Sequence, residues 1–353
     1  MTKRRSLLCD NTEHRIAALR IAALRIAVLA VAVTVIASCT ETAPATAPDT
    51  PTAATPPVAA ESIRRVTQCV VPPAPSDAVV TMQTDVRYAV VDGRTLSFDL
   101  ATPSGATSSR PLVVLFHGGG FRGGDKRALQ DEIRMLASLG YAAASVNYRL
   151  TSEPRYVFPA PFSDARCALR VLAARAATFR IDASRIAIGG TSAGGALALA
   201  VALNSDIALD AALPQTACDA GAMTVPRISA LVSWYGGGET RDATLFGSGT
   251  AQALAEMLGG TPTQVPLNAA LVSPLAHVDR ADPPTLHLHG VDDDAVQIVQ
   301  AVRLDSALRA VGVPSLLVSL PGIGHGFAPL SSDAALRTVT CTALGFLSDR
   351  LRP

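Results

Sequence analysis

Short apolar runs alternate with amphipathic stretches from residue 88 to the end of the chain. The apolar runs are nearly continuous, which is typical of parallel strands buried on both faces of a sheet. The stretches between them carry apolar residues at a spacing of three and four, as amphipathic helices do. The pattern predicts strands at residues 88–91, 96–99, 111–116, 142–147, 185–189, 228–234, 285–289 and 315–320, and helices at residues 126–139, 164–177, 192–204, 296–311 and 333–350.

Turn signals agree with these limits. Asp92-Gly93 predicts a tight hairpin turn between the first two strands, and Gly140 predicts the end of the first helix. Strands that alternate with helices predict an α/β fold, in which helices cover both faces of a mostly parallel sheet. Ligands of such sheets bind at the carboxyl ends of the strands, so the residues that follow each strand are the candidates for function.

The first 38 residues have the pattern of an export signal. They carry six basic and two acidic side chains, and the uncharged run Ile26 to Ser38 follows. At 13 residues this run is short for a membrane span and typical of a signal-peptide core. Its end, Ile36-Ala37-Ser38-Cys39, resembles the lipobox of bacterial lipoproteins. The resemblance implies that Cys39 is lipidated and anchors an exported protein in the cell envelope; a secreted protein with an incidental cysteine is the alternative.

Residues 39–65 are rich in Pro, Thr and Ala and show no apolar period. Such a segment buries too little apolar surface to offset its conformational entropy, so we predict an extended tether before a folded domain at residues 66–353. The first 38 residues contribute +4 to the formal net charge of +1, which leaves about −3 for the rest. This balance excludes the basic surface of a nucleic-acid-binding protein.

Four cysteines fall within the predicted domain. An even number in an exported domain permits two disulfides. Cys69 and Cys341 lie at the two ends of the domain, which meet in many folds. Cys167 lies on a predicted helix, and Cys218 lies in a loop after the next helix. We predict the pairs Cys69–Cys341 and Cys167–Cys218; buried free thiols are the alternative.

A Gly-x-Ser-x-Gly sequence at residues 190–194 follows the strand at residues 185–189 and precedes a helix of small residues. A serine at such a strand-to-helix turn has a strained backbone, and glycines two residues away let the neighbouring chain pass. Ser192 would project at the top of the sheet, at a helix N-terminus that favours developing negative charge. We predict that Ser192 is a nucleophile; a glycine-rich helix start packed on the sheet is the alternative.

The sequence His-Gly-Gly-Gly at residues 117–120 follows the strand at residues 111–116. Glycines expose backbone N–H groups without side chains in the way, as an oxyanion hole requires. A dinucleotide-binding loop is the alternative, but no acidic residue ends the next strand, and the bulky residues 121 and 122 interrupt the turn.

Two later strands also end in polar side chains. Three aspartates, Asp292, Asp293 and Asp294, follow the strand at residues 285–289, and His325 follows the last strand between glycines. A histidine in a glycine-flanked loop is a poor core residue. The chain order serine, carboxylate, histidine is that of the α/β-hydrolase triad. A cation-binding loop of aspartates is the alternative, but the EF-hand spacing is absent, and we predict no metal site.

With these motifs the sequence resembles α/β-hydrolase esterases of the hormone-sensitive-lipase or bacterial carboxylesterase type. The resemblance runs from about Arg87 to the end of the chain, through ordered matches at residues 117–121, 124–126, 145–150, 158–160 with 164, 190–195, 273–274, 283–285, 289–290 with 293, and 325–327. It implies a mostly parallel eight-stranded sheet with helices on both faces. It also implies a serine carboxylesterase that acts through an acyl-enzyme and uses no cofactor.

The resemblance implies roles for single residues. The family spacing His-Gly-x-x-Asp-x-x-Val selects Asp293 as the acid, with Asp292 and Asp294 as alternatives. The catalytic triad is then Ser192, Asp293 and His325, and the oxyanion hole consists of the backbone N–H groups of Gly118, Gly119 and Ala193.

Five residues beside these motifs are assigned to the substrate-binding region: His117, Gly120, Phe121, Trp234 and Tyr235. We expect His117 to order the oxyanion loop rather than to act as a base. His287 and His289 share one face of a strand, and we expect them to pack rather than to catalyse.

The sequence departs from hormone-sensitive-lipase relatives before the sheet. The short, proline-containing stretch that precedes residue 87 cannot form their N-terminal helical cap. We expect an open site with a minimal cap, lidded by residues 206–227 and 236–282, and esters of short acyl chains as substrates, either small molecules or groups on polysaccharides. A serine peptidase that cleaves acyl-peptides and a catalytically inactive binding domain are the alternatives.

Overall fold

The computed structural model describes residues 79–152, 157–204, 207–211, 217–221, 223–327 and 333–352, all within the compact unit Pro57–Pro353. The predicted leader, the tether, the lipidation site Cys39 and the disulfide partner Cys69 lie outside these residues and stay predictions. Within the described residues, no helix is both long enough and apolar enough to cross a membrane.

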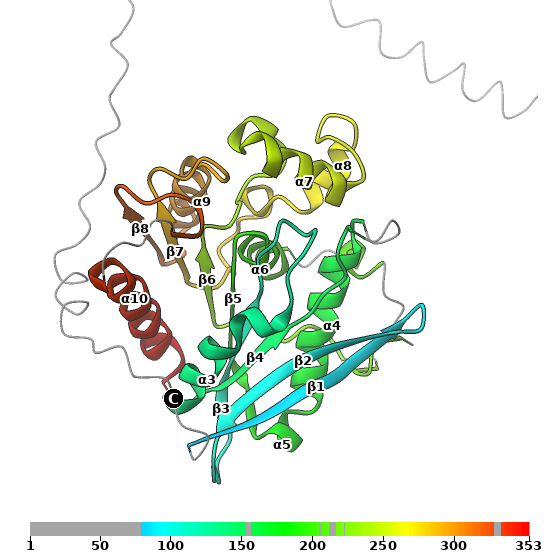
Figure 1. The fold of residues 1–353 in the computed structure, drawn as a ribbon, viewed down its shortest axis with the longest axis vertical. Coiled ribbons are helices and arrows are strands. Elements are labelled where there is room, and N and C mark those ends of the chain that lie inside the picture. Colours follow the sequence, from blue (N-terminus) through cyan, green and yellow to red (C-terminus); the bar gives the residue numbers. More distant parts are fainter. Residues whose placement is uncertain are drawn as a thin grey trace, which may run out of the picture. The chain divides into compact units, whose positions relative to one another are not determined.

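The domain is built on one eight-stranded sheet with the order β1-β2-β4-β3-β5-β6-β7-β8 (Figure 1). β1 and β4 both pair antiparallel with β2, and every other neighbouring pair is parallel. The predicted mostly parallel eight-stranded sheet is confirmed. The strands are β1 (Val80–Val91), β2 (Arg94–Pro103), β3 (Arg110–Phe116), β4 (Ala142–Val146), β5 (Ile181–Thr191), β6 (Ala230–Trp234), β7 (Thr285–Gly290) and β8 (Ser315–Leu320).

The predicted turn between the first two strands is also present. Asp92 and Gly93 have φ values of 51° and 77°, the left-handed pair that a two-residue hairpin turn requires. β1 and β2 therefore form a hairpin at one edge of the sheet (Figure 1).

β3 shows why the apolar runs are continuous. Leu112 and Val114 pack into one hydrophobic cluster and Val113 and Leu115 into another, and all four are at most 3% exposed. Because side chains alternate across a strand, both faces of the sheet must be covered. α4, α6 and α9 contribute to the first cluster, and α3 and α10 to the second.

The observed helices match the predicted ones within a few residues, except for α7 and α8, which the sequence pattern does not predict. Both lie within residues 236–282, where the predicted lid has no helix. The helices are α3 (Gln130–Ser138), α4 (Ala160–Ala174), α5 (Ala176–Phe179), α6 (Ala193–Leu203), α7 (Ser248–Leu258), α8 (Pro266–Leu271), α9 (Val299–Ala310) and α10 (Asp333–Leu351), with 3-10 turns η1 (Lys126–Leu129), η2 (Ile207–Asp210), η4 (Ala243–Leu245), η5 (Pro274–Ala276) and η6 (His325–Phe327).

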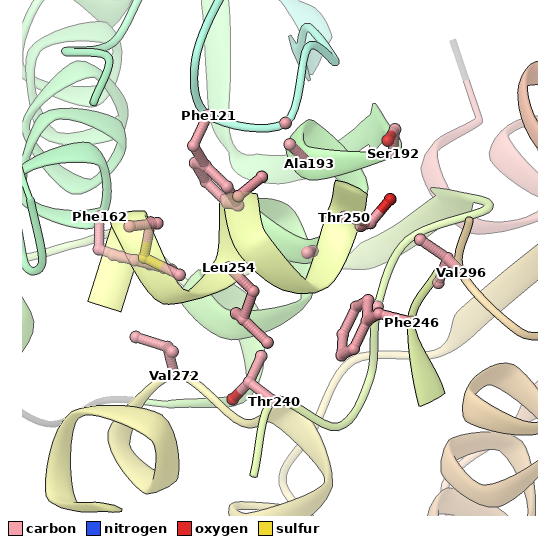
Figure 2. Close-up of a pocket in the computed structure, with 15 residues that line it drawn as sticks. Phe121, Phe162, Ser192, Ala193, Thr240, Phe246, Thr250, Leu254, Val272 and Val296 are labelled. Atoms are coloured by element: carbon pink, nitrogen blue, oxygen red, sulfur yellow. The ribbon is translucent and has the colours of Figure 1, made fainter. Parts of the chain in front are cut away.

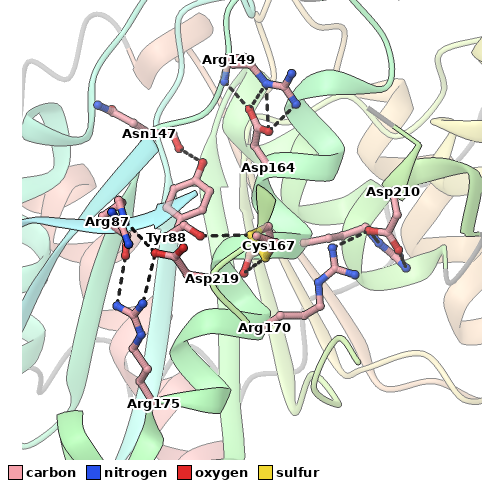
Figure 3. Close-up of a disulfide and its surroundings, with 12 residues drawn as sticks. Arg87, Tyr88, Asn147, Arg149, Asp164, Cys167, Arg170, Arg175, Asp210 and Asp219 are labelled. Carbon is pink, nitrogen blue, oxygen red and sulfur yellow. Dashed lines mark hydrogen bonds and ion pairs between the residues drawn. A yellow bond between two sulfur atoms is a disulfide. The ribbon is translucent and has the colours of Figure 1, made fainter. Parts of the chain in front are cut away.

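The predicted disulfide between Cys167 and Cys218 is confirmed (Figure 3). It joins α4 to the segment after η2, with a Cα–Cα distance of 5.9 Å. Cys341 is buried in α10, and its pairing with Cys69 stays a prediction because Cys69 lies outside the described residues.

The segment around this disulfide is fastened to α4. Asp210 of η2 forms ion pairs with Arg166 and Arg170 at 3.0 Å each (Figure 3). None of the described residues of 206–227 lines the cleft at Ser192. Among the described residues of the two predicted lid segments, only residues within 236–282 line that cleft, and the part of residues 206–227 in a lid stays a prediction.

Candidate active site

Ser192 lies at the sharp turn between β5 and α6. Its φ and ψ of 53° and −118° are a conformation that costs a non-glycine residue energy. A Cβ on Gly190 would overlap the carbonyl of Gly194, and a Cβ on Gly194 would overlap the carbonyl oxygen of Phe116. The structure thus has the tight turn that the Gly-x-Ser-x-Gly spacing predicts.

His325 and Asp293 reach this serine from two other strand ends. His325 begins η6 after β8, and its Nε2 lies 2.9 Å from Oγ of Ser192. Its Nδ1 lies 2.8 Å from Oδ2 of Asp293, in the loop after β7. The three side chains form one hydrogen-bonded chain, in which Nδ1 donates to the carboxylate and Nε2 can accept the serine proton.

The carboxylate of Asp293 is held by four donors. The N–H groups of Ala295 and Val296 donate to Oδ1 at 3.0 and 2.8 Å, and Nε2 of His289 lies 3.2 Å from Oδ2, which also accepts from His325. Burial alone would raise the pKa of Asp293. The hydrogen bonds from His289, His325 and Val296 outweigh burial and hold that pKa well below its usual range.

The neighbouring aspartates have no such surroundings. Asp292 and Asp294 are exposed, whereas Asp293 is 4% exposed and faces His325. The choice of Asp293 by family spacing therefore agrees with the geometry. Among the described residues, no group of three or more His, Cys, Asp or Glu side chains could hold a metal ion.

The glycine loop after β3 lies against the serine. A Cβ on Gly118 would lie 3.4 Å from Cβ of Ser192 and 3.0 Å from the carbonyl oxygen of Thr191. Ala193 is the first residue of α6, so its N–H has no acceptor within the helix. Gly118 and the start of α6 thus lie beside Ser192, and the oxyanion hole of Gly118, Gly119 and Ala193 stays a prediction.

His117 supports this loop from behind. Its ring stacks on the Tyr148 ring with 4.4 Å between centroids, and the Tyr148 hydroxyl donates to the His117 carbonyl at 2.7 Å. Burial lowers the pKa of His117, which is 1% exposed. His117 orders the loop as predicted, but it does not line the cleft, so its assignment to substrate binding is wrong.

A largely apolar cleft of about 510 Å³, open mouth included, extends from Ser192 (Figure 2). Gly120 and Phe121 line it, as predicted. Trp234 and Tyr235 do not; they pack against the cluster beneath α3 and α10. The Tyr235 ring contacts the ring of His325, with 5.0 Å between centroids, so the assignment of these two residues to the substrate-binding region stays a prediction for the other side of Ser192.

One wall of the cleft comes from α7, which the sequence pattern does not predict. Arg122 of the glycine loop holds α7 with two hydrogen bonds to Glu256, at 2.6 and 2.7 Å. The residues of α7 that line the cleft are Thr250, Ala253, Leu254 and Met257. Their spacing of three and four places them on one face of a helix, and this spacing is the sequence signal that could have identified the wall.

Comparisons with known proteins agree with this site. The BD-FAE family model matches residues 98–308, more than half of the chain. "Probable carboxylic ester hydrolase LipM" of Mycobacterium tuberculosis is 30% identical over 239 residues, which are 66% of this chain and 53% of LipM. The chain therefore spans about half the length of that relative.

Two solved structures have a similar fold. An esterase from Thermogutta terrifontis with propionate bound has a TM-score of 0.63 and 23% identity, over 79% of this chain and 98% of that one. A truncated carbohydrate esterase from gut microbiota has a TM-score of 0.62 and 24% identity, over 80% and 100%. The fold, the serine-histidine-aspartate geometry and the family match agree: the chain belongs to the BD-FAE family, and its domain is an α/β-hydrolase of the esterase type.

Proposed function

We propose that the protein is a serine carboxylesterase that hydrolyses esters of short acyl chains. The observation that carries the proposal is the hydrogen-bonded chain from Ser192 through His325 to Asp293. Oγ of Ser192 attacks the ester carbonyl while Nε2 of His325 takes its proton and then gives it to the leaving alcohol. Water, activated by the same histidine, then releases the acid from the acyl-enzyme.

The remaining groups stabilise charge during these steps. Asp293 keeps the proton of His325 on Nδ1 and stabilises the imidazolium. The N–H groups of Gly118, Gly119 and Ala193 bind the oxyanion of the tetrahedral intermediate, and one such donor contributes about 3–4 kcal/mol.

The cleft is proposed to hold the acyl group. The leaving alcohol must lie beside His325, which protonates it, and His325 does not line the cleft. The acyl group therefore extends to the other side of Ser192. Phe162 and Val272 line the cleft on the side away from the serine (Figure 2), and this apolar lining suits an acyl chain of a few carbons.

The alcohol side is open by contrast. The His325 side chain is 27% exposed. Val291 and Asp292 are also exposed, in the loop after β7 that carries Asp293, which we call the acid loop. This opening supports the further proposal that the site accepts a large alcohol, so that acyl groups on polysaccharides are substrates as well as small esters.

A panel of p-nitrophenyl esters tests the acyl-chain proposal. We expect acetate and butyrate to react faster than octanoate, and Leu254→Ala and Met257→Ala to raise the ratio of octanoate to acetate kcat/KM about tenfold, because pocket volume equal to one methylene is worth roughly 1–3 kcal/mol. Leu267→Ala is the matched control, since Leu267 is 78% exposed on α8 and outside the cleft.

Other outcomes of the panel would contradict the proposal. Wild-type preference for octanoate, or an unchanged ratio in both cleft variants, would place the acyl chain elsewhere. Cleavage of an N-acetyl-peptide without ester turnover would favour the acyl-peptide peptidase alternative.

We also propose that Cys39 is lipidated and that residues 40–65 tether the domain to a membrane of the cell envelope. The support is the sequence pattern of basic residues, a 13-residue uncharged run and Ile36-Ala37-Ser38-Cys39. Cys39→Ser is expected to abolish incorporation of labelled palmitate and to move the protein out of the membrane fraction. Cys9→Ser, in the same leader, should change neither; equal labelling of the Cys39 variant would contradict the anchor.

A further inference from the structure

A second histidine lies at the catalytic carboxylate. His289, near the end of β7, is 1% exposed, and its Nε2 lies 3.2 Å from Oδ2 of Asp293 and 2.8 Å from the carbonyl oxygen of Val296. Both of these oxygens are acceptors, so Nε2 of His289 must carry a proton. The carboxylate oxygen that accepts from His325 therefore also faces a donor from the sheet.

We infer that His289 is a positioning residue of the triad, whose Nε2–H group holds Asp293 in place and reduces the attraction of that carboxylate for the proton on His325. The inference rests on the proposed function, because it takes Ser192, His325 and Asp293 as the reacting set. It assigns to His289 a role beyond the packing that its strand position predicts.

The contacts around His289 form a closed ring. Val296 donates its N–H to Oδ1 of Asp293 and accepts from His289 through its carbonyl, while His289 reaches Oδ2. The acid loop is thus tied to a strand that has neighbours on both sides. Without His289, Oδ2 would be held by His325 alone, and His325 is the residue whose charge changes during turnover.

The N–H group of His289 also lowers the negative charge on Oδ2 of Asp293, the atom that His325 contacts. A hydrogen bond to Oδ2 withdraws negative charge from the atom that accepts from Nδ1 of His325. If that donor is removed, Asp293 stabilises the imidazolium more strongly, and the catalytic base becomes protonated at higher pH. The expected sign is a shift of the acid limb of kcat/KM toward higher pH.

Another titratable side chain lies beside His289. His287 is on the same face of β7, and burial, the largest cause, lowers the pKa of His287 to about 3. His287 therefore stays neutral across the range of an esterase assay, and a shifted acid limb would report on Asp293 and His325.

The test compares His289→Phe with His289→Gln. Phenylalanine keeps the ring volume without a donor, whereas the glutamine amide nitrogen lies near the position of Nε2 and can donate. We expect His289→Phe to lower kcat/KM for p-nitrophenyl acetate about tenfold, as for loss of a hydrogen bond to a charged group, and to move the acid limb to higher pH. His289→Gln should restore most of both.

His287→Phe is the matched control. It replaces the neighbouring buried histidine, whose Nε2 has no hydrogen-bond partner among the described residues, and it should leave the acid limb in place. If His289→Phe does not fold by circular dichroism, His289→Asn takes its place, because its shorter side chain cannot reach Oδ2.

The pH profile is also measured as the rate of labelling by a fluorophosphonate, which needs Ser192 and His325 but no ester. Wild-type labelling without ester turnover would contradict the proposed function and leave this inference intact. The inference about His289 would be overturned if the acid limb of the pH profile were the same in the wild type, His289→Gln and His289→Phe.

Discussion

Ser192→Ala is expected to lower kcat for p-nitrophenyl acetate by roughly five to six orders of magnitude. The variant keeps His325 and the backbone donors but has no atom that can attack the carbonyl, so no acyl-enzyme forms. Alanine has the same Cβ as serine, and the strained φ of 53° is therefore no harder to adopt. The remaining rate should come from substrate binding and the oxyanion hole alone.

The measurement is single-substrate kinetics together with fluorophosphonate labelling of the same preparations. Ser248→Ala is the control, because Ser248 is an exposed serine at the start of α7, the helix that walls the cleft. The control should label and turn over like wild type. More than about one percent of wild-type turnover in purified Ser192→Ala protein, well above what such variants retain, would remove Ser192 from its role.

The triad could be predicted because its members stand at strand ends. Apolar periodicity located β5, β7 and β8, and the carboxyl ends of parallel strands meet at one edge of a sheet. Ser192 and His325 follow two of these strands in glycine-flanked turns, where a core role is a poor explanation. Their 2.9 Å contact follows from topology that the sequence pattern already contained.

The acid was harder to identify from residues alone. Asp292, Asp293 and Asp294 follow the same strand, and adjacent loop residues differ only in the direction in which the backbone points them. Family spacing selected Asp293, and the structure gives the physical reason, which is a set of donors from Ala295, Val296 and two histidines. Those donors depend on loop conformation, which residue types do not encode.

The walls of the cleft were predicted least well. A strand-end position places a residue near the site without deciding which face of the sheet it joins, and Trp234 and Tyr235 turn toward the α10 side. The position of the His117 side chain was mispredicted for a related reason, because its ring stacks on Tyr148 behind the loop and does not face the cleft. Residues 250, 253, 254 and 257 of α7 have the spacing of a helix face, but the threonine and alanine among them make that face weakly apolar, so the pattern did not indicate a helix.

Asp293→Asn is expected to lower kcat by about four orders of magnitude, while Asp292→Asn and Asp294→Asn change it less than about threefold. The amide oxygen of asparagine will take the Oδ1 position, because the N–H groups of Ala295 and Val296 point there. The amide NH₂ then faces Nδ1 of His325. A donor cannot pair with a donor, so the proton of His325 moves to Nε2, where the ring can no longer accept the serine proton.

This outcome can be measured in two ways for the Asp293 variant. Steady-state kinetics should show the loss in kcat, and ¹⁵N spectra of labelled histidine should show the His325 proton on Nε2 instead of Nδ1. The exposed neighbours Asp292 and Asp294 serve as matched controls, since each loses one charge from the same loop. If either control lost as much activity as Asp293→Asn, loop charge rather than the 2.8 Å contact with His325 would be the source of the effect, and the assignment of the acid would fail.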